Sequence, residues 1–177
     1  MAAREARQEH DGHIAQHSRA LRELTAAGSE GEKMKIADIL ETKGSTVHSV
    51  LPWLTVTEVV DRLGRLGIGA VLVCDEKSAI AGIVSERDIV RALRQHGASL
   101  LTMPVSEVMT HYVQTTHPDE TVAHAMARMT AGRYRHLPVI DNGRLVGMVS
   151  IGDLVKHRVR EMELETGVLR DALISRY

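Results

Sequence analysis

Two phrases of the sequence each place a serine three residues before an aspartate, a spacing that can support chemistry. They are "GIVSERDIV", which contains Ser85 and Asp88, and "GMVSIGDLV", which contains Ser150 and Asp153. A carboxylate accepts hydrogen bonds from two neighbouring hydroxyl groups, so each aspartate suits the edge of a ribose. The same spacing fits a capping box, in which the serine begins a helix and the acidic residue bonds back to it. Both interpretations stay open, and one geometry can serve both.

Basic residues gather in a third phrase, "RYRHLPV". Arg133 and Arg135 offer planar guanidinium groups that match phosphate oxygens. His136 titrates near neutral pH, so the affinity for an anion would vary with pH. The alternative is a solvated helix end, because cations favour the C-terminus of a helix. The corresponding phrase of the first copy, "GIGAVLV", carries no charge, so two sites built from these phrases are expected to differ in ligand or affinity.

The elements that must position these residues occur twice in the same order: a short helix, a strand, a helix, two strands joined by a turn, and a second helix. The longer helices have apolar residues at helical spacing, as at Val59, Leu63 and Leu66. The strands are short apolar runs such as "AVLVC". This pattern predicts an α/β fold, or α+β sandwich, in which helices cover a sheet. Units of about 60 residues would be marginal alone, so the two are expected to pack on each other.

The repeat also sets the expected domain boundaries. Residues 34–100 form the first unit, which begins with the short helix "IADIL" and the strand "TVHSV". Residues 101–177 form the second, which begins with "VSEVM" and "YVQTT" and ends in a long helix over about 150–176. An apolar stripe on that helix is predicted to pack in a dimer. Residues 1–33 are polar and mixed in charge, which predicts an extension that is helical or disordered.

Composition argues against several classes of protein. The net charge of −1 and the near absence of aromatic residues argue against a nucleic-acid partner. No apolar run approaches the about 18 residues that span a membrane. Cys74 is the single cysteine, so no intrachain disulfide is possible and a cytoplasmic location is expected. His10, His13 and His17 have helical spacing, but nothing supplies a second shell for a metal there.

The chain contains two β-α-β-β-α units in tandem. Each contains the run Gly, an apolar residue, Val and Ser, followed three residues after the Ser by Asp. This arrangement resembles the CBS domain, named after cystathionine β-synthase. The phrases "GIGAVLV", "GIVSERDIV", "RHLPVID" and "GMVSIGDLV" carry the resemblance, which covers about residues 34–160. The layout resembles small stand-alone bacterial CBS-pair proteins. The resemblance implies two units related by a pseudo-twofold axis, called a Bateman module. It also implies clefts that bind AMP, ADP, ATP, NAD(H) or S-adenosylmethionine.

The resemblance further implies roles for individual residues. The aspartates would hold ribose hydroxyls, and basic residues of the opposite unit would hold phosphates. Asp88 would thus face Arg135 and His136, whereas Asp153 would face Gly69 and Ala70 and draw on Arg87. "RHLPV" resembles the "HRLPV" phrase of the γ subunit of AMP-activated protein kinase, with the two basic residues in swapped order. The expected nucleotide-binding residues are Thr46, Val47, Gly69, Ala70, Ser85, Arg87, Asp88, Val113, Gln114, Arg133, Arg135, His136, Leu137, Pro138, Ser150 and Asp153.

These expectations describe a regulatory, signal-transducing module with an adenine nucleotide as its effector. No nucleophile, base or proton-transfer group accompanies the clefts, so an enzyme is not expected, nor a catalytic cofactor or metal. Binding would shift the relative angle of the two units or of two protomers. The expected partners are a second copy, packed through the helices, and an effector protein whose identity the sequence leaves open. The alternative is a structural homodimer or interaction scaffold that binds no ligand.

Overall fold

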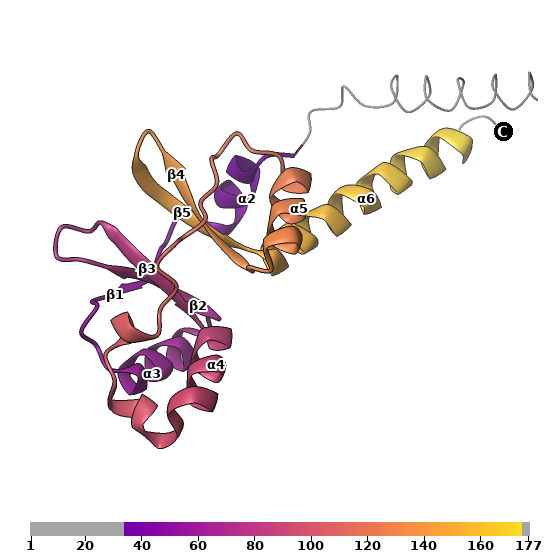
Figure 1. Ribbon diagram of the computed structural model, residues 1–177. Coiled ribbons are helices and arrows are strands. Elements are labelled where there is room, and N and C mark those ends of the chain that lie inside the picture. Colours follow the sequence, from indigo (N-terminus) through magenta and orange to yellow (C-terminus); the bar gives the residue numbers. More distant parts are fainter. Residues whose placement is uncertain (1–33, 175–177) are drawn as a thin grey trace, which may run out of the picture. The chain divides into compact units, whose positions relative to one another are not determined.

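The computed structural model describes residues 34–174, with side chains as far as residue 163. Residues 35–177 group into one unit, and the predictions for residues 1–33, including the three N-terminal histidines, lie outside the described residues. Helices and strands are interspersed along the chain (Figure 1). The predicted mixed fold of helices and strands is therefore confirmed.

One half of the structure is built on a three-stranded sheet, here called the β1–β3 half. Its strands are β1 (Ser49–Val50), β2 (Ala70–Cys74) and β3 (Ile80–Ser85), in that order across the sheet. β1 runs parallel to β2, and β3 runs antiparallel to it. Every residue of β2 is buried. Helices α3 (Val56–Leu66) and α4 (Glu86–His96) belong to the same half.

The core of this half follows from the patterns of its elements. Val59 and Leu63 on α3 pack with Val71 and Val73 of β2 and with Val84 of β3. Thr55 begins α3 with a capping box, in which its hydroxyl accepts from the Glu58 backbone and Glu58 accepts from the Thr55 backbone. The helical spacing of the apolar residues therefore sets the buried face of α3, and the cap sets where the helix begins.

The other half is built on the hairpin of β4 (His136–Asp141) and β5 (Arg144–Ser150), here called the β4–β5 half. Helices α5 (Val122–Gly132) and α6 (Ile151–Ile174) belong to it. The predicted strand "YVQTT" is reduced to one parallel bridge, in which Thr116 pairs with Val139. Its backbone donates to Pro138 O at 2.9 Å and accepts from Ile140 N at 2.9 Å. The first predicted strand, "TVHSV", is likewise short, since β1 holds only its last two residues.

The first short helices of the two repeats are exchanged in space. Helix α2 (Ile36–Lys43) precedes the β1–β3 half in sequence but packs against β5 and α6. A Cβ at Gly147 would lie 2.6 Å from Leu40 Cδ2, so the glycine lets α2 approach β5 closely. The 3₁₀ helices η1 (Gly97–Thr102) and η2 (Val105–Glu107) lie on the β1–β3 half, where Val105 N donates to Leu54 O at 2.7 Å. The repeats in sequence and the packed halves in space are therefore different divisions of the chain.

Candidate functional site

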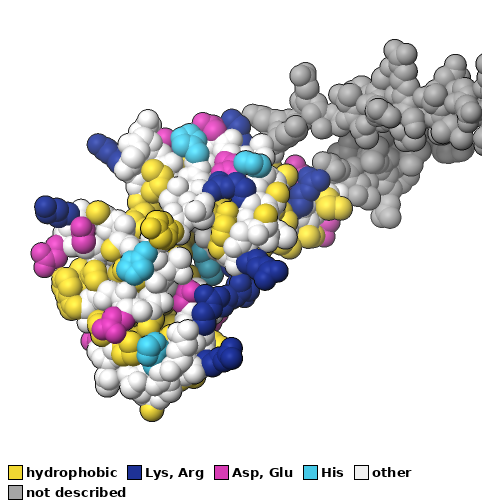
Figure 2. All heavy atoms as spheres, in the orientation of Figure 1, with side chains coloured by type: hydrophobic (Ala, Val, Ile, Leu, Met, Phe, Trp, Pro, Cys, Tyr) yellow, Lys and Arg dark blue, Asp and Glu magenta, His cyan; other side chains and the backbone are white. Residues whose placement is uncertain are grey.

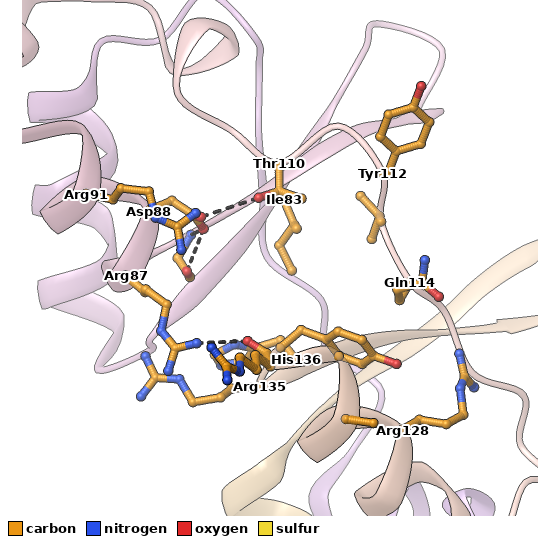
Figure 3. Close-up of a pocket in the computed structure, with 16 residues that line it drawn as sticks. Ile83, Arg87, Asp88, Arg91, Thr110, Tyr112, Gln114, Arg128, Arg135 and His136 are labelled. Carbon is orange, nitrogen blue, oxygen red and sulfur yellow. Dashed lines mark hydrogen bonds between the residues drawn. The ribbon is translucent and has the colours of Figure 1, made fainter. Parts of the chain in front are cut away.

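A cavity of about 1130 Å³ lies between the two halves, and both contribute to its wall. Figure 2 shows Lys and Arg side chains gathered where the end of α5 approaches α4. Figure 3 shows the cavity with its side chains drawn as sticks. The lining residues are Ile83, Ser85, Arg87, Asp88, Arg91, Thr110, Tyr112, Val113, Gln114, Arg128, Ala131, Gly132, Arg133, Tyr134, Arg135 and His136.

Asp88 lies in the first turn of α4 and forms the capping box expected from its spacing. Its Oδ2 accepts from Ser85 N at 2.9 Å and from Ser85 Oγ at 2.6 Å. Its Oδ1 accepts a longer hydrogen bond, from Thr110 Oγ1 at 3.3 Å. The cap therefore uses one carboxylate oxygen and leaves the other weakly engaged at the cavity wall (Figure 3). This geometry is compatible with both interpretations of the Ser–Asp spacing.

Arg133 ends α5 in a backbone conformation that favours glycine. Its φ is 55°, and Gly67, which ends α3 in the same left-handed region, has φ 61°. A residue with a Cβ pays roughly 1 kcal/mol in this region. Such strain is typical of functional positions. At Arg133 the strained backbone places a guanidinium-bearing residue in the cavity wall.

Asp153 lies in the first turn of α6, where it repeats the capping box but has a different partner. Its Oδ2 accepts from Ser150 N and from Ser150 Oγ, both at 2.8 Å. Lys43 Nζ donates to the same oxygen at 2.6 Å. Burial acts to raise the pKa of Asp153, but the hydrogen bonds from Lys43 and Ser150 outweigh it and leave that pKa lowered. The second aspartate is therefore held as a paired carboxylate.

Gly69, which is expected to face Asp153, has a carboxylate beside it. A Cβ at Gly69 would lie 3.2 Å from Glu86 Oε2 and 3.7 Å from His136 Cε1. A carboxylate therefore stands beside Gly69, which the sequence places opposite Asp153 in the second cleft. Seven other predicted residues also lie outside the lining of the large cavity: Thr46, Val47, Ala70, Leu137, Pro138, Ser150 and Asp153.

Comparisons with known proteins agree with this duplicated architecture. The model of the CBS domain family matches residues 36–95 and again residues 105–160. This chain belongs to the CBS-domain family. It is 36% identical over 138 residues to the mitochondrial CBS domain-containing protein CBSX3 of Arabidopsis thaliana, covering 73% of this chain and 67% of that protein.

Solved CBS structures share the fold. A CBS-domain containing protein from Agrobacterium tumefaciens is 42% identical, with a TM-score of 0.70 over 71% of this chain and 99% of that one. A putative signal-transduction protein with CBS domains from Burkholderia ambifaria is 39% identical, with a TM-score of 0.67 over 72% of this chain and 95% of that one. The CBS domain pair of protein MJ0100, solved with 5′-methylthioadenosine and S-adenosylmethionine, is 26% identical, with a TM-score of 0.64 over 73% and 98%.

Arg87 belongs to the Asp88 cavity of this CBS pair, although the sequence assigns it to the Asp153 cleft. Its Nη1 donates to Arg133 O at 2.8 Å, which ties the first turn of α4 to the end of α5. A cation at that carbonyl is favourable because the C-terminus of a helix carries partial negative charge. The side chain therefore bridges the two halves at the cavity wall.

His136 lines the Asp88 cavity and stands near the Asp153 group as well. Burial lowers its pKa, and the positive charges of Arg135 and Lys43 lower it further. Asp153 and Glu86 act in the opposite direction and do not overcome these effects. His136 is therefore neutral at neutral pH, and any gain of charge there requires a more acidic solution.

Several cavity residues escaped the sequence predictions. Arg91 follows Arg87 by one helical turn, a spacing that would have revealed it as a neighbour on the same face of α4. Arg128 gives no such signal, because its role depends on α5 packing. Its Nη1 donates to Glu120 Oε2 at 2.8 Å and its Nη2 to Thr115 O at 3.0 Å, so its charge is paired.

Among the described residues, no three His, Cys, Asp or Glu side chains come together as a metal site would require. No helix in the same part of the chain combines the length and apolar character needed to cross a bilayer.

Proposed function

We propose that this CBS pair is a non-catalytic regulatory module that binds a phosphorylated adenine nucleotide in the cavity beside Asp88. One observation carries the proposal. The cavity wall sets one carboxylate from the β1–β3 half, Asp88, opposite Arg133 and Arg135 at the end of α5. A ribose and a phosphate chain need this pairing of an acceptor at one end and planar donors at the other.

The charge of the cavity favours an anionic ligand. Arg128 is paired with Glu120, so the cationic lining comes from Arg87, Arg91, Arg133 and Arg135. Asp88 is the one carboxylate among the described lining residues. A sulfonium nucleoside such as S-adenosylmethionine would add a cation to this wall. AMP, ADP, ATP and NAD(H) bring phosphates instead, and guanidinium groups bind phosphates through paired hydrogen bonds.

The size of the cavity fits this ligand class. Pockets for small ligands span about 300 to 1,000 Å³, so a cavity of about 1130 Å³ accommodates a nucleotide with more than one phosphate. In this arrangement Asp88 Oδ1 holds the ribose, Val113 and Gln114 flank the adenine, and Arg133 and Arg135 hold the phosphates. Because the ligand touches both halves, its binding would favour one relative angle between them.

The partner of such a module is a second copy of the chain and, through it, an effector protein. Helix α4 leaves Val90 68% and Leu93 49% exposed, and α6 leaves Val159 49% exposed. Apolar helix faces of this kind support the proposed homodimer through the CBS helices. A cytoplasmic location is part of the same proposal, supported by the free Cys74.

A ligand panel on the purified protein tests the proposal. ATP, ADP, AMP, NAD⁺, NADH and S-adenosylmethionine, each at about 1 mM, would be compared by thermal unfolding. A ligand present at a hundredfold its Kd stabilises the protein by about 2.7 kcal/mol. We expect stabilisation by at least one phosphorylated nucleotide and none by S-adenosylmethionine.

Asp88→Asn is the variant expected to lose nucleotide binding, since asparagine retains an oxygen for the cap but lacks the negative charge. Its control is Asp38→Asn, because Asp38 accepts from Lys35 N at 2.7 Å in the same type of capping box on α2. The nucleotide shift should disappear in the first variant and persist in the second. No shift with any ligand would favour the ligand-free scaffold.

A further inference from the structure

The structure assigns Lys43 the role of closing the second CBS cleft, so that each chain carries one open nucleotide site and one occupied by its own lysine. The inference rests on the proposed function in one respect, namely that the aspartate of a Ser–Asp phrase can hold a ribose when its carboxylate is accessible. It goes beyond that function because it names the residue that makes the two clefts unequal.

The contacts of Lys43 define the closure. It lies in the last turn of α2, and its Nζ donates to Asp153 Oδ2 at 2.6 Å and to Met148 O at 3.1 Å. The ammonium group thus stands against the carboxylate that a ribose would need. Two acceptors and a charge pair fix it there, with the Lys43 side chain 40% and that of Asp153 25% exposed.

Thr110 is the counterpart that shows what an open cleft looks like. It lines the Asp88 cavity itself, and its hydroxyl donates to Asp88 Oδ1 at 3.3 Å. A neutral, long contact therefore replaces the short ionic one between Lys43 and Asp153. A ligand hydroxyl displaces the first at little cost, whereas displacing the second leaves an ammonium group without its partner.

The exchange of short helices explains how a lysine from the start of the chain reaches this carboxylate. Helix α2 packs on β5 and α6, so its last turn ends beside the first turn of α6. The two paired residues are 110 positions apart in the sequence. The closure is therefore a product of tertiary packing, and the local phrase "SIGD" gives no sign of it.

The surroundings of the closed cleft also disfavour phosphate. Glu86 Oε2 lies 3.2 Å from the Cβ position of Gly69, and Arg87 is directed to the other cavity. His136 adds no charge at neutral pH, because burial and the nearby Arg135 lower its pKa. The ligand chemistry that remains for an opened Asp153 cleft is an uncharged adenine nucleoside, and adenosine is the probe of choice.

Lys43→Met tests the inference by removing the ammonium group while keeping the aliphatic stem. Adenosine binding would be measured by calorimetry in the wild type, in this variant and in the variant combined with Asp153→Asn. We expect Lys43→Met to gain one adenosine site per chain that the added Asp153→Asn removes. Loss of the competing ion pair should tighten this site by about tenfold over the wild type.

Lys35→Met is the matched control. Lys35 flanks the other end of α2, and its ion pair with Asp119 at 3.2 Å is also exposed. This variant removes the same charge from the same helix and should bind adenosine as the wild type does. Far-UV circular dichroism and the thermal midpoint would verify that both variants are folded.

Several results would overturn the role of Lys43. They are an Asp153-dependent adenosine site of equal affinity already in the wild type, no new site in Lys43→Met, and weaker binding in that variant. ADP binding in the same samples reports on the Asp88 cavity separately. A gain of the Asp153-dependent site, with no phosphorylated nucleotide of the panel binding to any sample, would support the closure and refute the proposed function. Absence of both would refute both.

Discussion

Asp88 and Asp153 occupy the same position of the repeated sequence phrase and make the same capping box, yet they have different chemical surroundings. Asp88 meets a threonine hydroxyl at 3.3 Å and an arginine-rich wall. Asp153 meets a lysine at 2.6 Å and stands on the side where Glu86 approaches Gly69. Duplication therefore preserved the element that starts each helix, while the residues brought in from elsewhere set whether the carboxylate is available to a ligand.

The two clefts differ because the residues that contact each aspartate from distant parts of the sequence differ. Each capping box is local, because its donor and acceptor are three residues apart. Lys43 reaches Asp153 from α2, and Arg133 reaches the Asp88 cavity from α5. Changing one remote neighbour should therefore convert one type of cleft into the other without altering either cap.

Thr110→Lys is the strongest test of this comparison, because it gives Asp88 the kind of partner that Asp153 has. An ammonium group beside Asp88 would compete with the ribose hydroxyls, and we expect the affinity for ADP to fall by about tenfold or more. Isothermal titration calorimetry would measure the change.

The control for this variant is Thr102→Lys, since Thr102 is exposed on η1 and its hydroxyl bonds only locally, to Ser99 O at 3.2 Å. It adds the same charge away from the cavity and should leave ADP binding unchanged. A rise in affinity in Thr110→Lys would contradict the comparison, because it would mean that attraction of the phosphates outweighs access to Asp88.

The sequence predicted those features that depend on local pattern. The order of elements and both capping boxes follow from periodicity, spacing and repetition. The position of Arg135 and His136 across the cavity from Asp88 was implied by the resemblance to the CBS domain. What it missed depends on packing between distant segments. Ile36 and Ile39 are fully buried, so the pattern of α2 reveals a buried face. It does not reveal which half covers that face, and this choice decides where Lys43 lies.

The short edge strands illustrate a second limit. "YVQTT" has the composition of a strand, but Thr116 alone bridges to β4, and its hydroxyl donates to Glu120 Oε2 at 2.6 Å. Arg128 occupies the neighbouring carbonyl of Thr115. The Arg128 side chain thus takes a backbone carbonyl that a longer strand could have paired, and strand propensity contains no information about this bond.

Arg133→Gly separates the two consequences of placing an arginine in a left-handed conformation. The glycine is relaxed at φ 55°, so the free energy of unfolding should rise by about 0.5 kcal/mol. One guanidinium group leaves the cavity, so ADP should bind about fivefold more weakly. Urea unfolding and calorimetry measure the two effects. The bond from Arg87 is to the backbone oxygen of residue 133, so it persists.

Asn142→Gly is the matched control, since Asn142 also has a left-handed backbone, with φ 47°, in the turn between β4 and β5. It should stabilise the protein slightly and leave ADP affinity unchanged. Unchanged ADP affinity in Arg133→Gly would mean that the strained arginine at this position does not contribute to ligand binding in the cavity.

The smallest expected effect concerns His136, which lines the Asp88 cavity, lies near Asp153 and changes charge with pH. Burial lowers its pKa, with Arg135 and Lys43 acting in the same direction and Asp153 and Glu86 opposing them. The unfolded chain, with a usual pKa of about 6.5, therefore binds a proton more readily than the folded one does. The stability contributed by neutral His136 is complete above that pH and is lost as the pH falls toward the lowered value.

His136→Gln should reduce this acid-side loss, by less than about 1 kcal/mol in the free energy of unfolding between pH 7.5 and pH 5.5. His96→Gln, at an exposed histidine on α4, should retain the wild-type profile. Urea unfolding across this pH range would separate the two variants. Identical profiles for His136→Gln and the wild type would mean that His136 is protonated as easily in the fold as outside it. In that case the ammonium of Lys43 and the guanidinium of Arg135 would not act on the imidazole that lies between the two clefts.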